Sequence, residues 1–235
     1  MEQGPQIYTV QNLIVVPNCL PDAKITALKE YQKRFATNTQ AAKVGSVPEN
    51  LDKDGTIGNR KEIRACDISW IFPDAKFTSE LTGMVNNMIT NVALQNFGFD
   101  IHRLEPLQYT HYTYHENNTV KDHYDWHMDS SLNTRPVPFD RKLSASIQLS
   151  DSDEYEGCNL EFPGLNKIFE DDVIELEVGH NVGTMEPITA KEVKSLLRKK
   201  GTAIFFPSML FHRVTPIESG ERYALVVWLQ GPKYR

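Results

Sequence analysis

Long hydrophobic runs are missing from this sequence, and so is a leader segment. No apolar run approaches the roughly 18 residues that a membrane-spanning helix needs. Residues 1–5 (MEQGP) have neither the basic nor the apolar part of a secretory signal peptide. We therefore expect a cytoplasmic protein that has no membrane as a partner.

Cysteine pairs and positive charge are also scarce. The three cysteines, Cys19, Cys66 and Cys158, lack Cys-x-x-Cys spacing, which argues against a disulfide framework or a zinc ribbon and favours reduced structural thiols. The 25 Lys and Arg residues are outnumbered by 31 Asp and Glu residues, and the formal net charge is −6. Because nucleic-acid binding needs a basic face, nucleic acid is not expected as a partner.

The first hundred residues predict a scaffold of strands and helices. β-Branched residues predict strands at 6–16 and 63–72. Apolar residues at helical spacing predict helices at 21–35 and 73–96. The polar segment 37–59 predicts a long loop, which either covers a substrate or is a surface excursion.

Beyond residue 100 the pattern changes to short strands divided by Gly, Pro, Asn and Asp, which is typical of a sandwich or barrel. One helix is predicted at 189–200, and Ser144, Ser146, Gln148 and Thr202 are expected to line the barrel interior. No repeat or linker divides the chain, so we expect one domain over 1–235, with a scaffold in 1–100 and a β core in 101–235. The strands are predicted at 104–114, 123–129, 142–149, 159–162, 172–177, 201–206 and 223–230.

The most informative stretch is 123–130 (HYDWHMDS), which holds two His-x-Asp pairs. Alternate side chains of a strand point to the same face. The side chains of His127 and Asp129 can therefore converge on one metal ion, and so can those of His123 and Asp125. Because all four share one parity, strand geometry alone does not separate the two pairs.

A third candidate ligand and a cation occur further along the chain. His212 follows the apolar run 205–211, and Arg222 lies ten residues later, before the apolar segment 223–229. Two imidazoles and one carboxylate on one face of an ion leave the opposite face open, as in the facial triad of non-haem Fe(II) oxygenases. A buried Arg222 needs an anionic partner, and the carboxylate of a 2-oxo acid matches its two-pronged guanidinium.

Together, these motifs resemble the Fe(II)/2-oxoglutarate-dependent dioxygenases of the prolyl 4-hydroxylase type, and among them the small microbial and viral hydroxylases. The resemblance covers roughly residues 104–232 and implies a double-stranded β-helix (jelly roll) buttressed by the N-terminal helices. It is carried by the ordered segments 124–130 (YDWHMDS), 141–144 (RKLS), 148–150 (QLS), 155–160 (YEGCNL), 206–208 (FPS), 212–216 (HRVTP) and 220–222 (GER), with Trp228.

The resemblance also implies roles for single residues. It makes His127, Asp129 and His212 the Fe(II) ligands, and Arg222 the partner of the distal carboxylate of 2-oxoglutarate. By the same comparison, His123 and Asp125 lie beside the pocket, where the Asp125 carboxylate can orient a ligand imidazole.

In the family a tyrosine on the strand before the His-x-Asp pair touches 2-oxoglutarate. Tyr112 and Tyr114 have the same parity on that strand, and both are candidates. The sequence departs from the family pattern at two places near them. Residues 115–121 (HENNTVK) lengthen a connection that is a short Gly turn in the family, and Cys158-Asn159 replaces a Gly-Gly pair.

The implied reaction uses dioxygen to hydroxylate an unactivated C–H bond and converts 2-oxoglutarate to succinate and CO2. The implied substrate is a prolyl residue of a peptide or protein, with ascorbate as a reductant and the host cytoplasm as the location of a viral member. Two alternatives stay open. One is the same chemistry on a free amino acid, another small molecule or a nucleobase, and the other is a non-enzymatic metal-binding β-helix module. The oligomeric state is not predicted.

Overall fold

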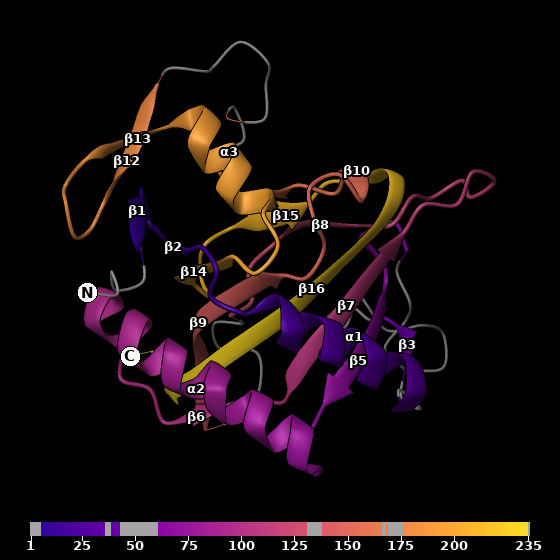
Figure 1. Ribbon diagram of the computed structural model, residues 1–235, viewed down its shortest axis with the longest axis horizontal. Helices are drawn as coiled ribbons and strands as arrows, with labels where there is room; N and C mark the ends of the chain where they lie inside the picture. The colour runs from indigo at the N-terminus through magenta and orange to yellow at the C-terminus, as the bar shows by residue number, and fades with distance from the viewer. Residues whose placement is uncertain are drawn as a thin grey trace.

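Two antiparallel sheets and three helices make up the part of the chain that the structure describes (Figure 1). The structure is a computed structural model, and it describes residues 6–35, 39–42, 61–130, 138–165, 168 and 176–234, without the side chains of 92–94. Among these residues, no helix combines the length and apolar character that crossing a membrane requires.

The larger sheet has the strand order β13-β12-β1-β2-β14-β9-β16-β7-β5-β3, with β10 and β6 also paired to β16. The smaller sheet has the order β11-β15-β8-β4. The strands of the larger sheet are β1 (Tyr8–Val10), β2 (Leu13–Val16), β3 (Gln40–Ala41), β5 (Asp67–Ile71), β6 (Arg103–Leu104), β7 (Leu107–Thr113), β9 (Phe139–Gln148), β10 (Tyr155–Gly157), β12 (Glu177–Asn181), β13 (Pro187–Thr189), β14 (Ala203–Pro207) and β16 (Ile217–Pro232). Those of the smaller sheet are β4 (Arg64–Ala65), β8 (His123–His127), β11 (Leu160–Glu161) and β15 (His212–Val214).

Helices α1 (Asp22–Phe35) and α2 (Lys76–Phe97) cover one face of the larger sheet (Figure 1). Their buried side chains, such as Leu28 and Val85, form one core with Leu225 and Val227 of β16. Alternate residues of a strand point to opposite faces, and Ala224, Val226 and Trp228 accordingly line a cavity on the other side. The helices therefore fix the sheet whose second face forms the floor of that cavity.

The third helix, α3 (Ala190–Arg198), begins with a capping box. The Thr189 side chain accepts a hydrogen bond from the main-chain N–H of Glu192, and the Glu192 side chain accepts one from the N–H of Thr189. This reciprocal pair satisfies two main-chain donors at the start of the helix. At the other end of α3, Arg198 donates to the main-chain oxygens of Gly157 and Tyr155 and so holds β10 in place.

The three helices lie where the sequence predicts them, to within a few residues. Two segments that were predicted as single strands each form two strands instead. The segment 6–16 is a hairpin of β1 and β2, because the chain reverses at Gln11, which has a φ of 52°. The segment 63–72 is divided at Cys66, because β4 pairs with β8 in the smaller sheet while β5 pairs with β7 in the larger one.

Two other predictions fall largely outside the described residues. Most of the predicted loop 37–59 does so, and β3 forms in the short described part of it. The predicted strand 172–177 also lies outside them apart from its last two residues, and β12 begins where that strand was expected to end. The organisation as one domain stays a prediction.

Candidate active site

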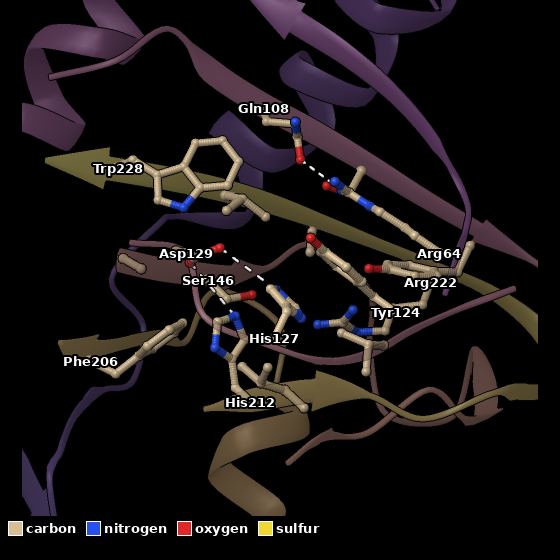
Figure 2. A pocket seen from close by; sticks show the side chains of 17 residues that line it. Arg64, Gln108, Tyr124, His127, Asp129, Ser146, Phe206, His212, Arg222 and Trp228 are labelled. Carbon is tan, nitrogen blue, oxygen red and sulfur yellow. Dashed lines mark hydrogen bonds and ion pairs between the residues drawn. The ribbon is translucent and has the colours of Figure 1, made fainter. Parts of the chain in front are cut away.

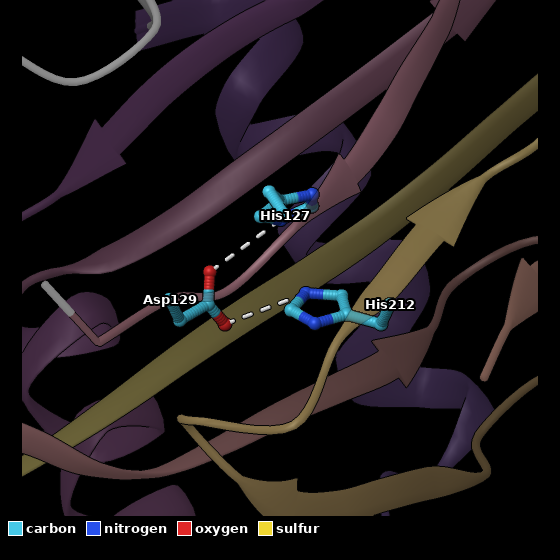
Figure 3. A group of neighbouring side chains, drawn as sticks. All are labelled: His127, Asp129 and His212. Atoms are coloured by element: carbon cyan, nitrogen blue, oxygen red, sulfur yellow. Dashed lines mark ion pairs between the residues drawn. The ribbon is translucent and has the colours of Figure 1, made fainter. Parts of the chain in front are cut away.

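Two strands of the smaller sheet bring two histidines face to face. His127 at the end of β8 pairs directly with His212 at the start of β15. Asp129 follows β8 by two residues. One ligand atom from each of these three side chains lies within 4.8 Å of the others (Figure 3). The three predicted metal ligands therefore meet at one point.

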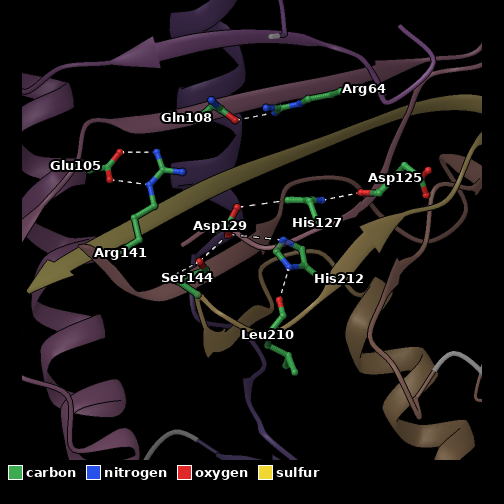
Figure 4. A network of polar contacts seen from close by, with 11 residues as sticks. Arg64, Glu105, Gln108, Asp125, His127, Asp129, Arg141, Ser144, Leu210 and His212 are labelled. Carbon is green, nitrogen blue, oxygen red and sulfur yellow. Dashed lines mark hydrogen bonds and ion pairs between the residues drawn. The ribbon is translucent and has the colours of Figure 1, made fainter. Parts of the chain in front are cut away.

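The two imidazoles are held in the same way. Nδ1 of His127 donates to the main-chain oxygen of Asp125 at 2.7 Å, and Nδ1 of His212 donates to that of Leu210 at 2.9 Å (Figure 4). A carbonyl oxygen only accepts hydrogen bonds, so each Nδ1 carries the proton and each Nε2 keeps its lone pair. The two Nε2 atoms lie 3.6 Å from the two carboxylate oxygens of Asp129.

The charge states of these groups suit metal ligation. Burial lowers the pKa of His212 to about 4, so its imidazole is neutral at physiological pH. Burial alone would raise the pKa of Asp129, but His212 and His127 hold it well below its usual range. Neutral imidazole and ionised carboxylate are the forms that bind a divalent metal.

Asp129 is also oriented from the larger sheet. The Ser144 hydroxyl on β9 donates to Oδ2 of Asp129 at 2.6 Å and lies 2.9 Å from the Ser208 hydroxyl. Ser144 and Ser208 are fully buried. The carboxylate is thereby fixed in one rotation between the two sheets.

The structure separates the two His-x-Asp pairs that the sequence left open. Both ring nitrogens of His123 lie against main-chain oxygens, those of Lys121 and Glu62, so His123 has no lone pair directed at the cluster. The Asp125 carboxylate accepts a hydrogen bond from the main chain of Trp126. The expectation that this carboxylate orients a ligand imidazole is wrong, because the main-chain oxygen of Asp125 does so instead.

Arg222 enters the same cavity from β16 and is almost completely buried, with 1% of its surface exposed. Its Nε and Nη2 donate to Oε1 of Gln148 on β9, at 3.2 and 2.9 Å. Gln148 in turn donates to the main-chain oxygen of Leu197 in α3. Arg222 has no ion pair with any carboxylate in the described part of the chain.

The structure distinguishes the two candidate tyrosines. Tyr112 on β7 is directly opposite Arg222 on β16, lines the cavity, and has its ring 5.5 Å from the guanidinium carbon. Tyr114 lies beyond the end of β7, near Lys121, and does not line the cavity. Of the four residues expected in the barrel interior, Ser144, Ser146 and Gln148 lie at or beside the site, whereas Thr202 is buried but does not line the cavity.

The cavity lies between the two sheets and has more polar walls than the sequence indicated (Figure 2). Arg64 of β4 and Gln108 of β7 line it and were not predicted as site residues. Tyr124 and Trp228 line it too, and belong to segments that carry the resemblance. The sequence could have indicated Arg64 as a buried arginine, because it is the single arginine of the largely apolar segment 63–72. Arg222 was noticed on the same kind of evidence, since it precedes an apolar segment.

A model of the 2OG-Fe(II) oxygenase superfamily matches residues 107–230, which include the three clustered side chains and Arg222. The chain belongs to this superfamily. The match is consistent with the donor set, since two imidazoles and one carboxylate with an open side are the ligands of non-haem Fe(II) oxygenases. In this 2OG-Fe(II) oxygenase, the residues present therefore fit an Fe(II) ion, and the buried Arg222 fits the free carboxylate of 2-oxoglutarate.

Curated relatives are consistent with this membership. The chain is 29% identical over 115 residues to a PKHD-type hydroxylase of Synechococcus sp. (strain CC9605), a match that covers 48% of this chain and 39% of the relative. The chain thus spans well under half the length of this curated relative.

The structure superposes on a prolyl-4-hydroxylase from Pseudomonas putida with a TM-score of 0.58 at 18% identity, covering 95% of this chain and 94% of the other. The viral collagen prolyl hydroxylase of Paramecium Bursaria Chlorella virus-1 gives 0.56 at 15% identity, covering 94% and 97%. At these identities the likeness concerns the fold, and the predicted jelly roll is confirmed.

Proposed function

We propose that this protein is an Fe(II)- and 2-oxoglutarate-dependent dioxygenase that hydroxylates an unactivated C–H bond of a prolyl residue in a peptide or protein. The observation that carries the proposal is the convergence of His127, Asp129 and His212 in one cavity with the buried Arg222. Dioxygen would supply the oxidising power and the new oxygen atom, with iron to activate it. 2-Oxoglutarate would supply two of the electrons as it is converted to succinate and CO2.

In this proposal the residues of the chain bind, orient and exclude water. Nε2 of His127, Nε2 of His212 and a carboxylate oxygen of Asp129 hold the metal. Arg222 is fixed by Gln148, so its remaining N–H groups can bind the distal carboxylate of the co-substrate. The apolar wall of the cavity, which includes Leu160, Phe206 and Val226, keeps water away from the reacting centre.

Tyr112 is the proposed second contact of 2-oxoglutarate. It is 3% exposed and lies opposite Arg222, so its ring closes the cavity beside the guanidinium. Tyr114, the alternative, is outside the cavity lining. A Tyr112→Phe variant keeps the ring and removes the hydroxyl, and an unchanged KM for 2-oxoglutarate would remove the hydroxyl of Tyr112 from the proposed contact.

The prolyl substrate is supported by the solved proteins that share the fold. Two of them are prolyl hydroxylases, and a third, from Trichoplax adhaerens, is a prolyl hydroxylase in complex with a hypoxia inducible factor peptide fragment. The curated relatives are PKHD-type hydroxylases. Each of these proteins shares less than a third of its residues with this chain over the matched segment.

The deciding experiment measures succinate formed from 2-oxoglutarate by protein loaded with Fe(II), with ascorbate as reductant, in the presence and absence of a proline-rich peptide. Peptide-stimulated succinate, together with a peptide that gains the mass of one oxygen atom, is the expected result. Succinate without any stimulation by the peptide would leave the oxygenase proposal and reject the prolyl substrate. No succinate from protein shown to contain iron would reject the enzyme and favour a metal-binding module.

A further inference from the structure

A second buried arginine faces the cavity, and neither the proposed iron site nor the proposed 2-oxoglutarate site uses it. Arg64 of β4 is 7% exposed and lines the cavity together with Arg222 (Figure 2). Strand β4 pairs with β8, with Arg64 directly opposite Tyr124, so Arg64 belongs to the same sheet as the histidine cluster. Its side chain reaches across the cavity to the larger sheet, where Nη2 donates to Oε1 of Gln108 at 3.0 Å.

The position of Arg64 relative to the metal cluster is set by Tyr124. The guanidinium carbon of Arg64 lies 4.3 Å from the centre of the Tyr124 ring. The same ring stacks on the imidazole of His127, with 3.5 Å between ring centres. Only the ring of Tyr124 therefore separates Arg64 from His127, a predicted metal ligand.

Several hydrogen-bond donors of this cavity have no partner in the described part of the chain. Nε of Arg64, the hydroxyl of Thr110 and Nε1 of Trp228 are all buried and make no hydrogen bond. All three residues line the cavity. A buried donor without an acceptor costs about 1–3 kcal/mol, so the cavity is built for a ligand that accepts several hydrogen bonds.

Arg64 also has no negative charge to balance it among the described residues. No ion pair joins it to a carboxylate there, whereas the nearby Arg141 is paired with Glu105 at 2.7 Å. Burial raises the pKa of the Cys66 thiol, so this neighbour of Arg64 is neutral at physiological pH. A buried, unbalanced guanidinium is costly unless a ligand neutralises it.

The net charge of the proposed complex also favours a second anion in the cavity. A divalent ion and the 2-oxoglutarate dianion cancel each other, and Asp129 balances one of the two arginines. One positive charge remains in the cavity. Since 2-oxoglutarate has a single distal carboxylate, it can occupy one arginine and leaves the other for a different anion.

We infer that Arg64 binds a carboxylate of the substrate, so that the C–H bond to be oxidised belongs to a molecule with a carboxylate close to the reacting carbon. This inference rests on the proposed function and narrows its substrate class. For a prolyl residue, the carboxylate is that of a C-terminal proline or the side chain of an acidic residue beside the proline. Arg64 thus sets specificity, with Gln108 holding its guanidinium in place.

The first arm of the test compares acids with their neutral forms on the iron-loaded wild-type protein. The panel contains a peptide that ends in proline with a free carboxylate, the same peptide amidated, and two internal-proline peptides with Asp or Asn beside the proline. We expect hydroxylation of a carboxylate form with a kcat/KM at least about 10-fold above that of its matched neutral form, as for a lost charge-assisted hydrogen bond. The member of the panel that responds identifies the source of the carboxylate.

The second arm uses Arg64→Gln, with Arg64→Lys as the variant that keeps the charge. In Arg64→Gln, KM for the acid should rise at least about 10-fold and its advantage over the neutral form should disappear. KM for 2-oxoglutarate should be unchanged. In Arg222→Gln the reverse is expected: KM for 2-oxoglutarate should rise, and the advantage of the acid over its neutral form should remain. Arg103→Gln, which lies outside the cavity, is the control and should behave as wild type.

The outcomes separate this inference from the function on which it rests. Equal activity on acids and neutral forms would overturn it, and so would succinate formation that no acid stimulates. A raised KM for 2-oxoglutarate in Arg64→Gln would overturn it as well, by assigning Arg64 to the co-substrate. No succinate in any wild-type reaction would overturn both proposals. If Arg64→Gln does not fold, the acid and neutral pairs on the wild-type protein decide alone.

Discussion

At the scale of single residues, the hydroxyl of Ser144 joins the two sheets at the carboxylate of Asp129. Removing it in Ser144→Ala leaves one carboxylate oxygen without its hydrogen bond at 2.6 Å. Loss of such an orienting partner lowers metal affinity about 10- to 100-fold. We expect a drop of this size in Fe(II) or Mn(II) affinity, measured by anaerobic titration.

Ser150→Ala is the matched control for Ser144→Ala. Ser150 is also a buried serine and lies two residues beyond the end of β9. Its hydroxyl accepts a hydrogen bond from the main chain of Tyr223 at 3.0 Å. It does not line the cavity. Both variants should lose similar stability, but Ser150→Ala should keep its metal affinity. Equal metal affinities in the two variants would show that Ser144 does not orient the carboxylate.

The two His-x-Asp pairs give a second comparison between single residues. His127→Ala removes an imidazole whose Nε2 faces Asp129, so Fe(II) retention and turnover should be lost while the circular dichroism spectrum stays that of a folded protein. His123→Ala removes a ring that binds two main-chain oxygens, and it should keep both metal and activity. Metal content after gel filtration measures the difference, and loss of metal in His123→Ala alone would reverse the assignment.

The three side chains of the cluster could be proposed from the sequence because short, local patterns single them out. Parity along one strand places His127 and Asp129 on the same face, and the apolar run before His212 predicts a buried strand end. Strand parity alone did not choose between the two pairs, and the resemblance favoured the second. The structure adds a physical reason, the main-chain oxygens of Glu62 and Lys121 that lie against His123, which parity does not reveal. Arg64 was missed for a related reason, since its neighbours Gln108 and Tyr124 are distant in sequence.

At the scale of elements, α3 supports Arg222 and thus the proposed 2-oxoglutarate site through its C-terminal turn. The main-chain oxygen of Leu197 accepts a hydrogen bond from the Gln148 side chain, and Gln148 in turn accepts hydrogen bonds from Arg222. Thr189→Ala removes the N-cap of this helix and should lower the free energy of unfolding by about 1 kcal/mol. Chemical denaturation at neutral pH measures the change.

The pH dependence of this variant follows from Glu192. Hydrogen bonds from the Thr189 main chain and hydroxyl lower the pKa of Glu192 below its ordinary value of 4.5. The stabilisation is therefore present above pH 4.5 and is lost as the pH falls through the lowered pKa. The difference between wild type and Thr189→Ala should narrow in acid. Thr184→Ala, which removes a hydroxyl bonded to Glu186 in a turn, should show neither effect.

Elements with a long, regular pattern were predicted, and elements defined by their partners were not. Helical spacing over many residues located α1 and α2, and α3 lies within the helix predicted at 189–200. By contrast, the division of 63–72 into β4 and β5 depends on which sheet each half joins. The hairpin of β1 and β2 depends on one residue, Gln11, with a positive φ that the local sequence does not announce.

At the scale of the whole molecule, the proposed ligands connect the two sheets. The histidines belong to the smaller sheet, whereas Arg222 and Ser144 belong to the larger one. Mn(II) and 2-oxoglutarate, added without dioxygen, should therefore stabilise the entire fold. A ligand at 100 times its Kd adds about 2.7 kcal/mol to the free energy of unfolding, and thermal melting measures the gain. His127→Ala should lose the gain from Mn(II), and a gain equal to wild type would place the metal elsewhere.

The central position of β16 has a consequence for how the protein is made. Translation releases β7 together with its partner β5 first, and β9 with its partner β14 later. In the described part of the chain, β7 and β9 are joined only through β16, which lies between them and follows both in sequence. Until the ribosome has released residues 217–232, the nascent chain carries two open sheet edges, which readily pair with other chains. The partly translated protein is therefore the form most exposed to aggregation, and the strand that closes the gap also brings Arg222 to the cavity.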